Sequence, residues 1–205
     1  MSWAHDAKFF VSVFVTLFVI MDPPGTVPLF LSLTNGRTAR ARRRAAWQAV
    51  VVAFFVITVF ALFGQSILDY LGITLAAMQG AGGLLLLLVA LQLLTGESED
   101  PAETANVNVA LVPLGTPLLA GPGAIVATIV FVRSVDTADE ALALALGVVA
   151  VHVVLFLFMR YSLAIIRVIK DSGVTLITRI AGLLLSAIAV QLVADSVTAF
   201  VHAAS

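Results

Sequence analysis

The chain has 205 residues, of which 61% are hydrophobic and 11% are charged, and its net charge is -1. A soluble domain is about 45–50% apolar and about 25% charged, so a soluble fold of this length could not remove so much apolar surface from water. The small net charge argues against nucleic acid as a partner. The absence of cysteine excludes disulfides, thiolate metal sites and cysteine nucleophiles.

The apolar residues gather in six segments, each long enough for a helix that crosses the hydrocarbon core of a bilayer, which takes about 20 residues. In chain order these segments are residues 9–33, 45–68, 73–94, 107–132, 138–159 and 175–201. Prolines and glycines interrupt the first and the fourth. The sequence therefore predicts an all-α membrane protein with six transmembrane segments, folded as a single transmembrane domain over residues 1–205.

The two halves of the chain resemble each other. The Gly-Leu-Leu-Leu run at 83–86 recurs at 182–185, and the two interrupted segments occupy corresponding places. Because each half holds an odd number of segments, the second half must enter the membrane from the opposite side. We predict two inverted three-helix repeats with broken helices 1 and 4, over residues 1–96 and 107–205, with an acidic loop at 97–106 between them. This organisation is typical of secondary transporters.

The lysines and arginines are unevenly distributed between the predicted loops, and this bias predicts the orientation of the chain. One side carries nine of the 11, and the other carries only Lys8 and Arg133. The basic side should be cytoplasmic, which leaves both termini extracytoplasmic. We interpret the predicted 37–44 loop as a determinant of topology that meets anionic lipid head groups. The nine basic residues are Arg37, Arg40, Arg42, Arg43, Arg44, Arg160, Arg167, Lys170 and Arg179.

Irregular backbone is tolerated at membrane depth only where protein buries it or where it lines a water-filled cavity. Six prolines mark the two breaks, and we interpret them as helix-breaking residues. A packing kink would explain a single break, whereas two matched breaks favour a shared site near the middle of the membrane. These residues are Pro23, Pro24 and Pro28 in the first break, and Pro113, Pro117 and Pro122 in the second.

Both breaks have the local sequence of a helix that restarts. Asp22 before Pro23, and Thr116 before Pro117, resemble an N-cap followed by proline at the first helical position. The run Gly121-Pro122-Gly123 offers another restart. The N-terminus of a half-helix exposes backbone N–H groups and attracts an anion such as a carboxylate.

Asp22 is the most informative single residue, because an ionisable group within a membrane span indicates a functional site. It could bind a substrate ammonium group, carry a proton, or merely cap the restarted helix. A charged Asp22 would compete with a substrate carboxylate at its own helix end, so the end near Thr116 or Gly121 would then take the carboxylate. The predicted substrate-binding residues, whose glycines would let the backbone approach a solute closely, are Asp22, Gly25, Thr26, Thr116, Gly121 and Gly123.

The other polar residues within the predicted spans have structural interpretations. Gln92 and Gln191 occupy corresponding positions of the two halves and could bond across helices. We expect His152 to be a hydrogen-bonded core residue, and Asp195 to be solvated at the outer interface. Close helix contacts are permitted by two pairs of small residues, Ala76 with Gly80 and Ala143 with Gly147.

Nothing in the sequence indicates an enzyme. Metal sites usually need clustered histidines, cysteines or carboxylates, and His5, His152 and His202 are far apart in the chain. No serine within the predicted spans has an obvious base beside it. We therefore expect no catalytic residue, no metal and no cofactor, although either H⁺ or Na⁺ would serve as a coupling ion for transport.

Two stretches of the chain resemble the signatures of the MarC family. Residues 22–34 read DPPGTVPLFLSLT and resemble the first signature, and residues 113–125 read PLGTPLLAGPGAI and resemble the second. The resemblance covers essentially the whole chain. The chain departs from the family pattern at Pro24 and Thr26, which replace isoleucine and asparagine, and at Gly115 and Thr116, where small and aliphatic residues are usual.

The resemblance implies a prokaryotic inner-membrane protein, and some family members are similar to transporters of small neutral amino acids such as alanine and glycine. We therefore expect a secondary transporter of a small neutral solute that works by alternating access. Its partners would be the lipid bilayer and a small-molecule substrate, and a homo-oligomer is as compatible as a monomer. The alternatives are a non-transport membrane protein that serves as a stress-related scaffold or regulator, and a channel. The short loops argue against the scaffold, since they leave little surface for a soluble partner.

Overall fold

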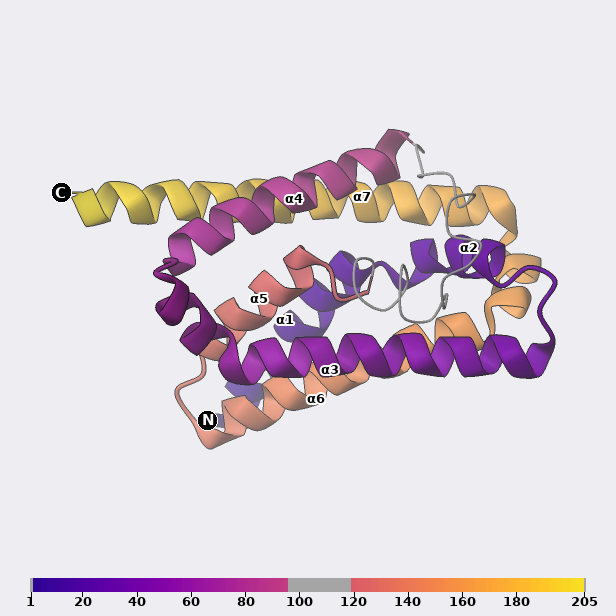
Figure 1. Cartoon of the computed structure of the whole chain (residues 1–205), viewed down its shortest axis with the longest axis horizontal. Helices are drawn as coiled ribbons and strands as arrows, with labels where there is room; N and C mark the ends of the chain where they lie inside the picture. The colour runs from indigo at the N-terminus through magenta and orange to yellow at the C-terminus, as the bar shows by residue number, and fades with distance from the viewer. Residues whose placement is uncertain (1, 96–118, 205) are drawn as a thin grey trace.

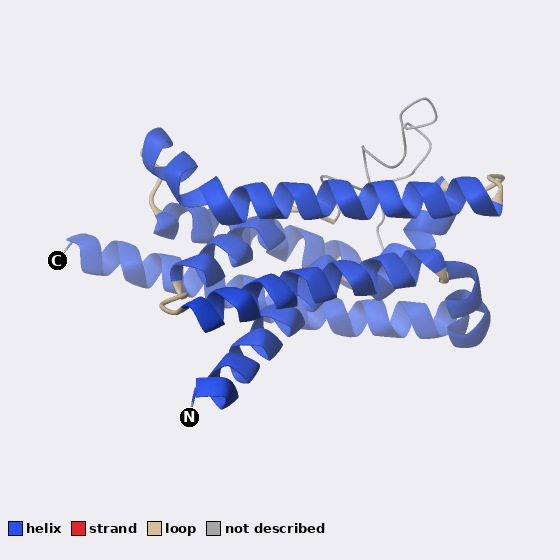
Figure 2. Cartoon of the chain, turned by 90° about the horizontal axis from the view of Figure 1, so that it is seen from below, coloured by secondary structure: helices blue, strands red, loops and turns tan. Residues whose placement is uncertain are grey.

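The computed structural model describes residues 2–95 and 119–204, and every regular element in this part of the chain is a helix (Figures 1 and 2). The prediction of an all-α protein is confirmed for these residues. In chain order the helices are α1 (Ser2–Met21), α2 (Pro23–Leu33), α3 (Ala39–Leu71), α4 (Leu75–Thr95), α5 (Pro122–Arg133), α6 (Ala138–Arg160) and α7 (Ser162–Ala204).

Five stretches of the described chain are long and apolar enough to cross a membrane. The fourth predicted segment is represented by α5 alone, a shorter apolar helix, because residues 96–118 lie outside the described part. The start of α1 and the end of α7 lie at the same end of the bundle, as an even number of crossings requires (Figure 1). The presence of six transmembrane segments therefore stays a prediction. The five stretches are His5–Val27, Ala39–Leu71, Leu75–Thr95, Ala138–Arg160 and Thr175–Ala203.

Two helices extend further than predicted at the end of the bundle that carries most of the arginines. α3 begins at Ala39, so most of the arginine run belongs to its first turns and the predicted 37–44 loop is wrong. Arginine and alanine favour helix, and the Thr38 hydroxyl accepts a hydrogen bond from the Ala41 N–H at 3.3 Å as the N-cap. α7 begins at Ser162 and passes an interruption at Lys170, where φ is 58°, before it reaches the predicted span.

α4 and α7, the third and the last predicted spans, pack along each other (Figure 1). A Cβ added at Gly83 of α4 would come within 2.8 Å of the Ala189 carbonyl oxygen on α7. One added at Gly182 of α7 would come within 3.2 Å of the Ala90 carbonyl oxygen on α4. In a bilayer, helices associate by close packing rather than by the hydrophobic effect, so glycine at these positions brings the two backbones into contact.

A side-chain hydrogen bond also joins these two helices. The Ser196 hydroxyl of α7 donates to the Ala76 carbonyl oxygen of α4 at 2.7 Å. Gly80 makes room for that serine, because a Cβ there would lie 2.7 Å from the serine Oγ. The close helix contact predicted for Ala76 and Gly80 is therefore confirmed.

The remaining helices enclose the apolar core. α1 packs along α6, and α3 packs on both α5 and α6. Leu17, Ile57 and Leu155, from α1, α3 and α6, are fully buried between them. Gly147 lets α6 approach α1, because a Cβ there would lie 2.7 Å from the Val13 side chain. This confirms the close contact predicted for the pair that includes Gly147.

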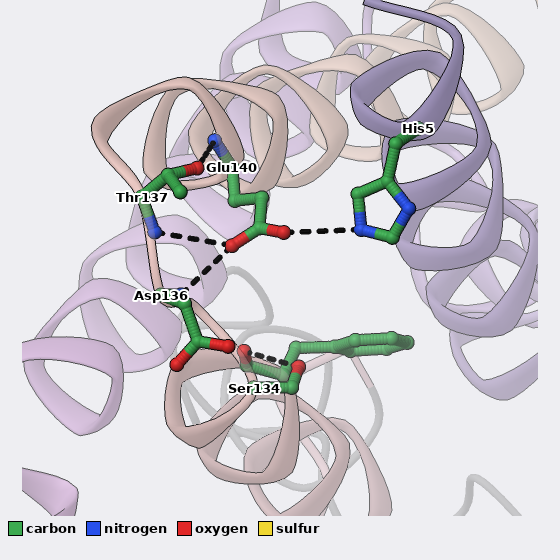
Figure 3. A network of polar contacts seen from close by, with 6 residues as sticks. His5, Ser134, Asp136, Thr137 and Glu140 are labelled. Atoms are coloured by element: carbon green, nitrogen blue, oxygen red, sulfur yellow. Dashed lines mark hydrogen bonds and ion pairs between the residues drawn. The ribbon is translucent and has the colours of Figure 1, made fainter. Parts of the chain in front are cut away.

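A polar network fixes the start of α6 to α1 (Figure 3). One carboxylate oxygen of Glu140 accepts hydrogen bonds from the backbone N–H groups of Asp136 and Thr137, at 2.8 and 3.1 Å. The other lies 3.1 Å from the ring nitrogen of His5. The Thr137 hydroxyl accepts from the Glu140 N–H, which completes a capping box. Glu140 thus caps the start of α6 and also joins α6 to α1.

Replacing Glu140 should destabilise the protein more than replacing its partner on α1. Glu140→Ala leaves two backbone N–H groups without an acceptor, whereas His5→Ala removes a side chain that is 70% exposed. Thermal unfolding of both variants in the same detergent should give the larger drop in melting temperature for Glu140→Ala. Equal drops would contradict the assignment of the network to the helix start.

The contact between α4 and α7 can be tested at Gly83. Gly83→Val should cost about 1–3 kcal/mol, because its methyl groups meet the backbone and side chains of α7 without room to move. Ala81→Val is the matched control, since Ala81 is exposed on the same helix. Thermal unfolding in detergent should give a lower melting temperature for Gly83→Val than for Ala81→Val. Equal melting temperatures would contradict this packing.

Candidate functional site

The first predicted break lies at Asp22, between α1 and α2. Its backbone has a φ of 39°, a left-handed conformation that residues other than glycine seldom adopt. The Asp22 N–H still donates to the Phe18 carbonyl of α1 at 3.1 Å, and the Asp22 carbonyl accepts from the Thr26 N–H at 3.0 Å. The residue therefore ends one helix and begins the next without a loop between them.

The side chain of Asp22 caps the helix that restarts. Its Oδ1 accepts a hydrogen bond from the Gly25 N–H at 3.2 Å, and Pro23 is the first residue of α2. The predicted N-cap followed by proline is thus confirmed. Asp22 is only 7% exposed, and its second oxygen, Oδ2, is buried with no hydrogen-bond partner among the described residues. A buried carboxylate oxygen without a donor is costly and is suited to receive one.

The Asp22 carboxylate lies where a side chain at residue 25 would be, so this position requires glycine. A Cβ at residue 25 would overlap with Oδ2 of Asp22 and crowd its Cγ. The glycine therefore lets the carboxylate lie against the first turn of α2, where the N–H groups and the helix dipole favour negative charge. Its predicted contact with a solute stays a prediction.

Thr26 supports the break rather than pointing freely into a cavity. The threonine is 4% exposed, and its hydroxyl donates to the Asp22 carbonyl at 2.9 Å and to the Met21 carbonyl at 3.4 Å. The Met21 carbonyl lacks its regular helical donor, because the Gly25 N–H bonds the Asp22 carboxylate instead, and the Thr26 hydroxyl compensates for this. The hydroxyl proton is thereby committed to the backbone, and contact of Thr26 with a solute stays a prediction.

The second predicted break includes a helix restart at Gly121. Gly121 has extended backbone, with φ -64° and ψ 166°, and Pro122 is the first residue of α5. The predicted restart at this point is confirmed. Its N-cap, Gly121, has no side chain that could accept a hydrogen bond from the helix start. The start of α2, by contrast, carries its own carboxylate, so the two half-helix N-termini differ in charge.

Gly123 serves helix packing. A Cβ at this position would overlap with the Leu86 side chain of α4. The glycine therefore lets α5 lie against α4, and its predicted contact with a solute stays a prediction. The space beside its Cα is filled by a neighbouring side chain.

The prolines fall into three groups. Pro23 and Pro122 begin helices, as predicted, and Pro24 is buried in the first turn of α2. The prediction that Pro28 breaks the helix is wrong, because α2 runs without interruption from Pro23 to Leu33. Pro28 lies in the second turn of α2, where its missing N–H leaves the Pro24 carbonyl without its helical donor, yet the helix continues past it. Outside the described residues lie Pro113, Pro117 and the candidate Thr116.

The two breaks adjoin the same buried core. α1 packs on α5, and Met21, Leu119 and Ala120, which neighbour the breaks, belong to one buried apolar cluster. Two cavities in the described part lie at opposite ends of the bundle, and neither is lined by a predicted substrate-binding residue. The shared cavity between the breaks stays a prediction, since residues 96–118 lie outside the described part.

Among the other polar residues within the spans, Gln191 differs from expectation. Gln191 donates to Asp195 of its own helix at 2.7 Å, so the predicted bond across helices is wrong for this residue. Asp195 is exposed, as predicted. His152 is buried, and its Nδ1 lies 2.7 Å from the Val148 carbonyl, but its Nε2 has no partner among the described residues. The expectation of a hydrogen-bonded core histidine is therefore confirmed at Nδ1.

Three contacts that polar residues make between helices were not predicted from the sequence. His152 meets the ring of Phe54 on α3 edge-on at 5.2 Å, and the links from Ser196 and Glu140 are described above. For Glu140, the threonine three residues earlier was a usable signal, because it completes a capping box. For Phe54 and Ser196, partners far away in the chain decide the role, and no local pattern points to them.

Comparison with known proteins decides the family. Residues 7–201 match the family described as MarC family integral membrane protein. The chain belongs to the MarC family. A UPF0056 membrane protein of Aquifex aeolicus is 38% identical, over 95% of each chain. The UPF0056 membrane protein YvbG of Bacillus subtilis is 33% identical, over 91% of this chain and 92% of the relative.

The family extends to more distant relatives. The UPF0056 membrane protein YhcE of Escherichia coli is 28% identical, over 94% of this chain and 93% of the relative. No solved structure matches the chain. These relatives are membrane proteins by name, and their names state no substrate. Membership in the MarC family therefore establishes an integral membrane protein, and its chemistry has to be argued from the site.

The geometry around Asp22 predicts a strong coupling between this residue and Gly25. Gly25→Ala should destabilise the protein, because the new methyl group displaces the Asp22 carboxylate from the start of α2. In an Asp22→Ala background the obstructing oxygen is gone, so the same substitution should cost little. A double-mutant cycle of thermal stability in detergent measures this difference. If the stability losses of the two single variants simply add in the double variant, the contact between Gly25 and the Asp22 carboxylate is contradicted.

Proposed function

We propose that this MarC-family protein is a secondary transporter of a small zwitterionic solute, most simply a small neutral amino acid such as alanine or glycine. The observation that carries the proposal is the buried Oδ2 of Asp22, which has no hydrogen-bond partner among the described residues. An ammonium group supplies both the positive charge and the N–H donors that this oxygen would accept. A charged group within a span that keeps a free acceptor is characteristic of a substrate or ion pathway.

The two half-helix starts offer complementary charges. The start of α2 is occupied by the Asp22 carboxylate, so a substrate carboxylate would be repelled there. The start of α5 has glycine as its N-cap and no side-chain cap, so its N–H groups suit an anion. A zwitterion that places its ammonium group at Asp22 and its carboxylate at the start of α5 would use both. In this arrangement the substrate carboxylate does not compete with the Asp22 carboxylate for the same helix start.

The helix contacts support an inverted repeat and alternating access. If the first three spans correspond to the last three, α1 corresponds to the span containing α5, and α3 corresponds to α6. The contact of α1 with α6 then has its counterpart in the contact of α5 with α3, and α4 packs on its own counterpart α7. Such a pattern suits two related halves around a shared axis, with rocking of one half against the other as the transport motion.

The orientation of the protein follows from the charged ends of the bundle. The end with Arg42, Arg43 and Arg160 carries the excess of positive charge, while the opposite end carries His5 and Glu140. We therefore place the protein in the inner membrane with the arginine-rich end cytoplasmic and both termini outside. Either H⁺ or Na⁺ would couple the transport to a gradient.

The test is uptake by the purified protein in liposomes. Wild-type protein should take up labelled alanine with saturation, and excess glycine should inhibit the uptake. Asp22→Asn should lower the uptake by about 10- to 100-fold, which corresponds to losing a charge-assisted hydrogen bond of about 1.5–3 kcal/mol. Asp195→Asn is the matched control, because that carboxylate is exposed on α7, and it should transport normally.

The outcomes separate the alternatives. Normal transport by Asp22→Asn would exclude a charged role for Asp22. Uptake that does not saturate would indicate a channel, and no uptake of any tested solute by folded wild-type protein would favour a scaffold or regulator. Size-exclusion profiles and melting temperatures of all variants ensure that lost uptake is not lost folding. An imposed pH or sodium gradient identifies the coupling ion.

A further inference from the structure

A basic cavity lies at the arginine-rich end of the bundle, apart from the breaks. It has a volume of about 230 Å³ and lies where three helices meet. Arg42 and Arg43 come from the first turns of α3, Arg160 is the last residue of α6, and residues 162–164 form the first turn of α7. We propose that this cavity binds the phosphate of an anionic lipid head group.

The charged residues that line the cavity are all positive. Among the described residues the three arginines form no ion pair, and the ion pair between His5 and Glu140 lies at the start of α6, the opposite end of that helix from Arg160. The Nε of Arg42 is buried and has no hydrogen-bond partner in the described part of the chain. A buried guanidinium donor without an acceptor is costly. An anion in the cavity would remove that cost.

Phosphate is the anion that these groups suit. A guanidinium presents its N–H groups as a planar fork that matches two oxygens of a phosphate, and phosphate offers several such oxygens to neighbouring arginines. The first turn of α7 also lines the cavity, and the dipole of that helix favours negative charge at its start. The volume of the cavity is below the roughly 300 Å³ at which pockets for drug-sized ligands begin, so it fits a head group rather than a larger solute.

The surroundings place the cavity at the level of lipid head groups. α3 has 33 residues, which is about 50 Å of helix against about 30 Å of hydrocarbon, so its first turns extend beyond the membrane core. Trp47, one turn further along α3 from Arg43, packs edge-on against Phe156 of α6 at 5.7 Å. Tryptophan and tyrosine favour the boundary between hydrocarbon and water.

The rim of the cavity favours a lipid over free phosphate. Tyr161 and Leu163 line it and are both more than half exposed, so an apolar edge adjoins the arginines. The Arg160 guanidinium lies over the Tyr161 ring, 5.2 Å from its centre, which holds the charge at the cavity. A phospholipid satisfies both features, with its phosphate among the arginines and an acyl chain along the apolar edge. Basic pockets between membrane helices recognise anionic head groups in this manner.

The bound lipid would join the two halves of the chain. Arg42 and Arg43 belong to the first half, whereas Arg160 and the start of α7 belong to the second. A phosphate held by both would stabilise the contact between them at this end. The inference does not depend on the proposed transport function, since it concerns a separate cavity and is read out by lipid binding.

The experiment measures lipid retention by the full chain. Native mass spectrometry of protein from micelles with equal amounts of phosphatidylglycerol and phosphatidylcholine should show preferential retention of phosphatidylglycerol. The double variant Arg42→Gln/Arg160→Gln should bind it more weakly, by about fivefold for each arginine removed. The matched control Arg40→Gln/Arg44→Gln removes the same number of charges from the same end of the bundle, but neither residue lines the cavity, and it should retain the lipid as the wild type does.

Three results would overturn the proposal. Equal weakening in the control pair would mean that the arginine run attracts lipid by charge alone. Equal retention of the two lipids by the wild type would mean that the cavity does not select an anion. Inorganic phosphate that displaces phosphatidylglycerol at equal concentration would assign the cavity to free phosphate. A melting temperature that rises with phosphatidylglycerol in the wild type, but not in Arg42→Gln/Arg160→Gln, would support the proposal independently of mass spectrometry.

Discussion

Every backbone N–H and carbonyl group that leaves a regular helix inside a bilayer needs a partner from the protein, because the hydrocarbon offers none. This constraint shapes the break at Asp22. The carboxylate accepts the Gly25 N–H, and the Thr26 hydroxyl returns a hydrogen bond to the carbonyls at the end of α1. The break is therefore satisfied locally, and one carboxylate oxygen is left over. That oxygen distinguishes a possible binding site from a simple kink, which would leave no buried acceptor of this kind.

Close packing provides the frame that holds the breaks in place. Without a hydrophobic drive between helices in lipid, the bundle depends on backbone approach at small residues. Gly83 and Gly182 bring α4 and α7 together, and Gly123 lets α5 lie on α4. Glycine thus acts here mainly through its lack of a side chain. The consequence for function is that the start of α5 has a defined position against the rest of the core, which a site assembled from two half-helices requires.

The two ends of the bundle have different chemistry, and each ties helices together in its own manner. At one end, Glu140 joins the start of α6 to α1 through hydrogen bonds that the protein supplies itself (Figure 3). At the other, Arg42, Arg43 and Arg160 converge without a carboxylate among the described residues. One end is thus joined by partners within the protein, and at the other the proposed lipid phosphate would supply the anion. The distribution of charge also matches the bias that orients membrane proteins.

The class of protein, five membrane-spanning stretches and the helix restarts at Asp22 and Gly121 could be predicted from the sequence, because hydrophobic length and capping residues are local signals. The sequence also carried the two signatures that place the chain in its family. The continuation of α2 through Pro28 and the bond of Gln191 to Asp195 within α7 were not predicted, because a helix tolerates a proline, and a glutamine has several partners within reach. The arginine cavity could not be predicted at all. It depends on contacts between helices that lie far apart in the chain, and no local pattern records which side chain will face which neighbour.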